Sequence, residues 1–146
     1  NTRKGAPNDK GVAETERALA GLPLKLIWRQ PFEACMKEKQ KSVLGIDELV
    51  TPSYHRSGLE FLSQGTPCMC SVGPAAERAL MEATGAVQVP FMNVGVREAA
   101  SSVGRFLALF PNEQEAAGAA ARAWMERHYS PKALLERHYL PAWTGQ

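Results

Sequence analysis

The sequence predicts a three-layer α/β domain, in which a parallel sheet of about four strands lies between helices and a helical tail follows. Along residues 12–111, short apolar runs alternate with segments of helical character. This alternation is typical of parallel strands that are joined by crossover helices. Residues 112–146 are predicted as helices without a further strand. A chain of 146 residues has the length of one domain, and we expect residues 1–111 to form its α/β part and 112–146 its C-terminal helices.

The first half of the chain is expected to contain two strands and three helices after an N-terminal loop. Residues 1–12 are polar and carry glycine, proline, asparagine and aspartate, which favours a loop. A proline at the start of 31–42 and lysines near its end indicate a helix. The predicted helices are 12–22, 31–42 and 58–64, and the predicted strands are 24–28 and 43–47.

The second half is expected to contain two further strands and then mostly helix. Gly85 ends one helix, because glycine is common just after a helix C-terminus, and Asn112 is expected to cap another. The predicted strands are 68–72 and 87–89, and the predicted helices are 74–84, 94–110, 113–129 and 131–140. The residues Glu-Arg-His-Tyr at 126–129 recur at 136–139. In both copies we expect the tyrosine to pack while the glutamate and arginine stay in water.

Composition and charge exclude several classes of function. Apolar residues make up 45% of the chain and charged residues 22%, which are ordinary values for a globular domain. The formal net charge of +2 provides no large field for nucleic acid or an anionic membrane, so we expect no nucleic-acid partner. No apolar run approaches the roughly 18 residues of a membrane span, and no signal peptide is expected at the N-terminus.

The three cysteines indicate a reducing compartment, so we expect a cytoplasmic protein. Cys68 and Cys70 are predicted to be buried on one face of a strand, because alternate residues of a strand share a face. No histidine lies near them in the sequence to complete a ligand set. We therefore expect no metal site.

The segment 54–60 is the richest in candidate binding residues. Ligands of an open parallel sheet bind beyond the carboxyl ends of its strands, where this segment is expected to lie. Ser57 and Gly58 are predicted to precede a helix, so that their amides are free to bind an anion such as phosphate. His55 and Arg56 are placed to add charge-assisted hydrogen bonds there.

Glu60 has two interpretations in the sequence. It is predicted in the first helical turn, where a carboxylate can accept hydrogen bonds from the vicinal hydroxyls of a ribose. The alternative is a partner for the helix dipole, worth about 0.3–1 kcal/mol, and spacing alone favours this alternative. His55 taken alone is typical of a loop residue, and Asp47 of a cap. A solvated helix face is the interpretation for Lys37, Lys39 and Lys41.

Several stretches resemble a known family of enzymes. They are Asp-Lys-Gly at 9–11, Ile-Asp-Glu-Leu at 46–49, the run 58–67, and in the tail 118–124 and 128–131. Together they are similar to the C-terminal, nucleotide-sugar-binding half of the two-domain GT-B glycosyltransferases, of the group 1 or family 4 type. The resemblance covers nearly the whole chain. Its most specific part is Gly-Leu-Glu-x-x-x-x-Gly-Thr-Pro, which begins at Gly58.

The resemblance implies a Rossmann-like fold and a glycosyltransferase of hexosyltransferase type, which needs no metal and no cofactor. It assigns the donor ribose to Glu60. It assigns the diphosphate and sugar to Lys10, Tyr54, His55, Arg56, Ser57 and Gly58, and the base to Trp28, Arg29 and Gln30. The implied partners are a nucleotide-sugar donor and an N-terminal acceptor domain outside this chain. The chain alone is thus expected to be an inactive half, with any peripheral membrane association made through the other half.

One departure from the family pattern keeps other functions open. The family usually has two glutamates, of which Glu60 matches the second, and the first would fall at position 52, where this sequence has Pro52. Proline offers neither a carboxylate nor an amide N–H, so a contact to the donor sugar is missing. The alternatives are a non-catalytic module that binds a nucleotide or phosphosugar, and an interaction domain that docks a partner through its tail. For a half enzyme we expect a partly exposed apolar strip of Leu134, Leu135, Tyr139, Leu140 and Trp143.

Overall fold

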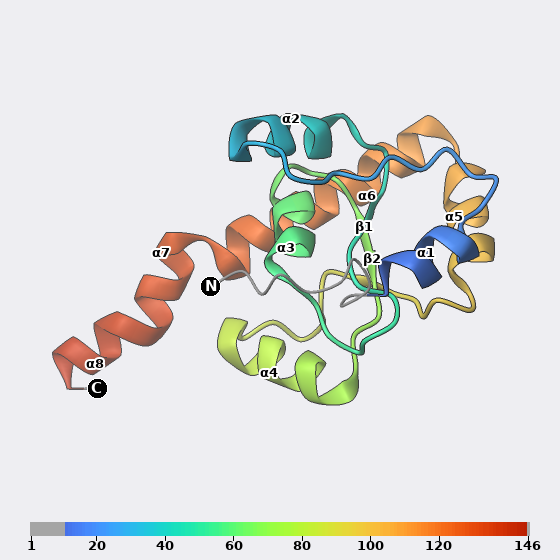
Figure 1. The fold of residues 1–146 in the computed structure, drawn as a ribbon. Helices are drawn as coiled ribbons and strands as arrows, with labels where there is room; N and C mark the ends of the chain where they lie inside the picture. The colour runs from blue at the N-terminus through green and yellow to red at the C-terminus, as the bar shows by residue number, and fades with distance from the viewer. Residues whose placement is uncertain (1–10, 146) are drawn as a thin grey trace.

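The computed structural model of the protein describes residues 11–145 and shows an α/β fold around a small parallel sheet (Figure 1). The described part contains three strands, β1 (Gly45–Ile46), β2 (Cys68–Cys70) and β3 (Met92–Asn93), in the order β1-β2-β3. Gly45 pairs with Cys68, and Met69 pairs with Met92. Both pairings are parallel, so the chain returns through helices between strands.

Six helices belong to the body of the molecule, and the tail adds four helical segments. The body helices are α1 (Val12–Ala18), α2 (Phe32–Lys41), α3 (Arg56–Ser63), α4 (Pro74–Thr84), α5 (Ala99–Leu107) and α6 (Pro111–Trp124). The tail segments are the π-helical turn η1 (Met125–Tyr129), α7 (Pro131–Leu134), the π-helical turn η2 (Leu135–Tyr139) and α8 (Leu140–Thr144). Both π-helical turns fall on the repeated Glu-Arg-His-Tyr residues.

Helices cover both faces of the sheet, as the sequence predicts. On one face, Cys68 and Cys70 pack with apolar residues of α3, α4 and α6. On the other face, Met69 packs with Leu19, which directly follows α1, and with residues of α5. The two thiols therefore share one buried face of β2, in agreement with the prediction from the alternation of strand residues.

Two of the four predicted strands are wrong. Residues 24–28 form no strand and pair with none in the described chain, and Leu24, Leu26 and Trp28 are exposed. An apolar run becomes a strand only where a neighbouring strand takes up its backbone hydrogen bonds, and none lies beside this one. The strand predicted at 87–89 lies instead at Met92–Asn93, after Pro90, and Val87 is exposed.

Most predicted helices are present, with changes at their ends. The helix predicted at 12–22 ends at Ala18, and the one predicted at 94–110 begins only at Ala99. The later start follows from two backbone hydrogen bonds that tie the preceding segment to the sheet end, from Val94 N to Cys70 O and from Val96 N to Leu49 O. The prediction that Asn112 caps α6 is wrong. The helix begins at Pro111, and Glu113 accepts a hydrogen bond from the amide of Phe110.

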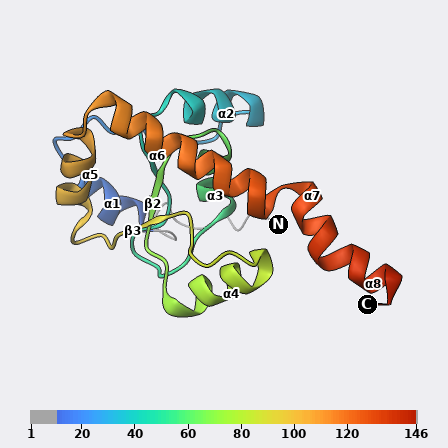
Figure 2. The same cartoon turned by 180° about the vertical axis from the view of Figure 1, so that it is seen from behind.

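The tail leaves the body of the molecule. Figure 2 shows α6 running past α3 before the chain bends and extends away through α7 and α8. The predicted strip is exposed in its outer part, and Trp143 has 72% of its surface accessible. Tyr129 packs against the core as expected, whereas Tyr139 is exposed and contacts Trp143, so the second copy of the repeat does not match the prediction.

The outer part of the tail contacts the body at the end of α4. His138 Nε2 lies 2.6 Å from the carbonyl oxygen of Ala83 in the last turn of α4. The Arg137 guanidinium lies over Gly85, which has a left-handed conformation with φ 62°. Basic side chains at this point face the negative end of the α4 dipole.

No described helix is both long enough and apolar enough to cross a membrane.

Candidate functional site

Two carboxylates shape the loop that follows β1. Asp47 Oδ2 accepts a hydrogen bond of 2.7 Å from the amide of His55. Glu48 Oε1 accepts from the amides of Val50 and Thr51 at 2.9 and 3.0 Å. Asp47 therefore caps a loop, which is the role that the sequence favoured, and the buried Glu48 closes the turn beside it.

Helix α3 begins at Arg56, two residues before the predicted start, with His55 as its N-cap. The amide of Gly58 is used by the helix, since it donates to the carbonyl of His55 at 3.0 Å. Within residues 11–145, the amides of Arg56 and Ser57 have no acceptor. The free donors are thus these two rather than Ser57 and Gly58. Gly58 serves packing, because a Cβ there would lie 2.9 Å from Asp47 Oδ2.

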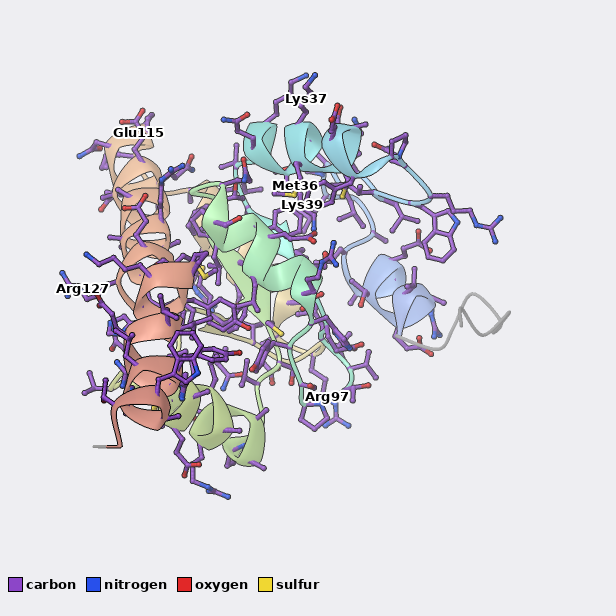
Figure 3. All side chains as sticks on the ribbon, turned by 90° about the vertical axis from the view of Figure 1, so that its left-hand side faces the viewer. Met36, Lys37, Lys39, Arg97, Glu115 and Arg127 are labelled. Atoms are coloured by element: carbon purple, nitrogen blue, oxygen red, sulfur yellow. The ribbon has the colours of Figure 1, made fainter. Side chains whose placement is uncertain are left out.

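Lys39 is the main residue that sequence reasoning missed. It was predicted on a solvated face, yet only 3% of its side chain is exposed, and its Nζ lies 2.6 Å from Glu60 Oε2. Figure 3 shows Lys39 and Met36 on the side of α2 that faces α3, while Lys37 points away from the body. The helical spacing could have indicated this, since Cys35 and Lys39 lie four residues apart on one face.

Glu60 lies in the second turn of α3, not in the first, so the helix-dipole interpretation is wrong. Its two oxygens accept from different cations, Oε2 from Lys39 and Oε1 from Arg56 Nε at 2.7 Å. Burial by itself raises the pKa of Glu60, but the hydrogen bonds from Lys39 and Arg56 outweigh it and bring the pKa below the usual value. Glu60 is therefore an ionised carboxylate that is 18% exposed.

The candidate residues border two separate hollows. A cavity of about 530 Å³ lies between the segment 22–28, α2 and the end of β1, and Trp28, His55 and Ser57 line it. Lys39 and Asp47 also line this cavity.

A second, open hollow of about 520 Å³ lies between α3 and the start of the tail. Glu60, Arg56 and Tyr54 line it together with Met125 and Tyr129. Both hollows are lined by residues of α3, with Arg56 bordering one and the adjacent Ser57 the other.

Of the three residues assigned to the nucleotide base, only Trp28 lines one of the two hollows. Trp28 lines the cavity and is 59% exposed. Arg29 and Gln30 are exposed, and Arg29 has an unusual positive φ of 49° while its guanidinium contacts the Trp28 ring. Lys10 lies outside the described residues.

Tyr54 and Pro52 have packing roles in the loop before α3. The Tyr54 ring stacks on Phe91 with 5.5 Å between ring centroids. Burial raises the pKa of its phenol, and the nearby Tyr129 adds to this increase. Pro52 contacts Gly73, and its carbonyl accepts from the Gly73 amide at 3.2 Å. Position 52 therefore helps to join the loops after β1 and β2.

The described residues offer no set of side chains arranged to bind a metal ion. They contain no group of three or more His, Cys, Asp or Glu side chains that could hold an ion. Burial raises the pKa of Cys70 to about 12 and that of Cys68 well above its usual value. Both thiols are thus protonated at neutral pH.

Comparison of the chain with protein-family models, with curated proteins and with solved structures finds no match.

Proposed function

We propose that this chain binds a nucleoside diphosphate sugar and acts as the donor-binding part of a glycosyltransferase. In this proposal the α/β body is the Rossmann-like half of a GT-B enzyme of the group 1 or family 4 type. The acceptor is held by a domain outside these residues. The proposal combines the resemblance of the sequence with one structural feature, the start of α3.

The observation that carries the proposal is the ionised Glu60, held one turn beyond two helix amides that have no acceptor within residues 11–145. The amides of Arg56 and Ser57 lie at the positive end of α3 and suit a phosphate. Glu60 opens onto the adjacent hollow and keeps some exposure, which a ribose diol needs to reach it. The diphosphate on the amides and the ribose on the carboxylate are adjacent parts of one nucleotide.

Electrostatic stabilisation of the leaving diphosphate is the chemistry that this arrangement can supply. Helix amides and a guanidinium act on the charge that develops on the leaving group, and such effects are commonly the largest in group transfer. Arg56 is exposed and donates a hydrogen bond to Glu60, so its charge lies beside that carboxylate, one turn along α3. The acceptor and any general base would come from the other domain.

A non-catalytic binding module is the second candidate, and Pro52 favours it. The position that carries a glutamate in the family here closes a packing contact with Gly73 and offers no carboxylate to the donor sugar. Such a module would bind the nucleotide without transferring the sugar.

Calorimetric titration with UDP, GDP and ADP tests the proposed function. We expect one of the three to bind, and Glu60→Gln to weaken this binding by about 10- to 150-fold, as for a lost hydrogen bond to a charged group. Glu115→Gln is the matched control, because Glu115 lies on the exposed side of α6 (Figure 3). Equal nucleotide affinity in the wild type and Glu60→Gln would contradict the ribose role.

Transfer assays separate the two candidates. An enzyme half, supplied with its acceptor domain, should transfer or hydrolyse the sugar of the matching nucleotide sugar. A binding module should retain the nucleotide affinity and show neither reaction.

A further inference from the structure

We propose that Lys39 is a positioning residue, which holds the Glu60 carboxylate in the orientation that accepts the two hydroxyls of a ribose. This inference rests on the proposed function and names a device within the same site. It assigns a role to the buried lysine that neither the resemblance nor the composition of the sequence indicates.

The contacts of Lys39 show that its ammonium group is fully committed to the protein. An ammonium has three N–H donors. Here they face Glu60 Oε2 at 2.6 Å, Ser57 Oγ at 3.0 Å and Ser57 O at 3.1 Å. The ammonium also lies 4.8 Å from the centroid of the Phe61 ring. With every donor used, Lys39 has no hydrogen bond left to offer a nucleotide and acts through Glu60.

Glu60 keeps the acceptor capacity that the proposal needs. An ionised carboxylate has about four lone-pair positions. Lys39 uses one on Oε2 and Arg56 uses one on Oε1, so each oxygen can still accept from one hydroxyl. Because the two cations approach different oxygens from different helices, α2 and α3, the carboxylate cannot rotate without breaking one of these bonds.

Stability alone does not account for a lysine at this position. Burying an ammonium costs several kcal/mol, and a well-packed apolar side chain in place of a buried ion pair is often as stable or more stable. What the charge adds is a fixed and ionised carboxylate at the edge of the hollow that Tyr54 and Tyr129 also line.

The test compares a nucleotide with its analogue that lacks the ribose hydroxyls. Titration calorimetry uses whichever of UDP, GDP and ADP binds the wild type most tightly, and its 2′,3′-dideoxy form. The variants are Lys39→Met, Glu60→Gln and the double substitution, each measured at a temperature where circular dichroism shows it folded. Lys37→Met is the matched control, since Lys37 is an exposed lysine of the same helix (Figure 3).

We expect Lys39→Met to lower affinity for the nucleotide by about tenfold, the effect of weakening one hydrogen bond to a charged group. Affinity for the dideoxy form should be unchanged, and the double variant should bind like Glu60→Gln alone. Equal losses for both ligands, or losses that add in the double variant, would mean that Lys39 supports the fold or contacts the phosphates instead. Lys39→Gln, which keeps an N–H donor without the charge, replaces Lys39→Met if the latter does not fold.

The failure of the proposed function gives a different result. In that case the wild type binds none of the three nucleotides, and both proposals fall together. If the wild type binds a nucleotide and Glu60→Gln weakens it, while Lys39→Met leaves the ribose preference intact, only the role of Lys39 is refuted.

Discussion

Removing the charge of Glu60 should destabilise the fold more than removing the charge of Lys39. Lys39 is 3% exposed and has no other carboxylate partner among the described residues, so Glu60→Gln leaves a buried ammonium with only Ser57 and a neutral amide. Breaking a buried pair in this way costs about 3 kcal/mol at the lower end of its range. Glu60 is 18% exposed and keeps Arg56, so Lys39→Met should cost only about 1.5 kcal/mol, as for one hydrogen bond to a charged group.

Thermal and urea unfolding at pH 7 measure these differences. For a chain of this length, about 3 kcal/mol corresponds to a fall in Tm of roughly 10 °C. The double variant should lose less than the sum of the single losses, because neither charge is then left alone. Glu115→Gln, on an exposed face, should stay within about 0.5 kcal/mol of the wild type. A Glu60→Gln protein as stable as the wild type would refute the buried pair.

The pH dependence of stability gives an independent check on the same pair. The folded pKa of Glu60 lies below its ordinary value of 4.5. The ionised form therefore stabilises the fold above pH 4.5, and this contribution is lost as the pH falls through the folded pKa. The difference in unfolding free energy between wild type and Glu60→Gln should shrink below about pH 4.5 and stay constant from pH 6 to 8. A difference that is independent of pH would contradict this assignment.

Three further predictions follow from close contacts and burial. Gly45→Ala should cost about 1–3 kcal/mol in urea unfolding, because the new Cβ would lie 2.7 Å from Cδ1 of Phe61, and Phe61→Leu should restore part of the loss. Gly85→Ala should lower the Tm, since its φ of 62° disfavours alanine and Arg137 occupies the space, and a smaller loss in an Arg137→Ala background would confirm the contact. Thiol titration with a disulfide reagent at pH 8 should modify the half-exposed Cys35 in the native protein, whereas Cys68 and Cys70 should react only on unfolding. Rapid reaction of all three thiols would show that β2 is accessible.

The sequence alone determined those features that depend on local order along the chain. The alternation of apolar runs and helices predicted an α/β fold, and β1, β2 and the main helices lie where it placed them. Gly85 predicted the end of α4 through its tolerance of a left-handed conformation. Cys68 and Cys70 were predicted on one buried face because side chains of a strand alternate with a period of two.

Pairing and burial were decided only by the tertiary structure. The run at 24–28 has the composition of a strand but lies beside no neighbouring strand, and composition does not say which neighbour will be there. Lys39 resembles Lys37 and Lys41 in the sequence, yet α3 packs on its side of α2 and buries it against Glu60. The charge of Lys39 is a property of the residue itself. The loss of its hydration and the carboxylate that replaces the water depend on α3, more than a dozen residues away, and only the folded chain brings α2 and α3 together.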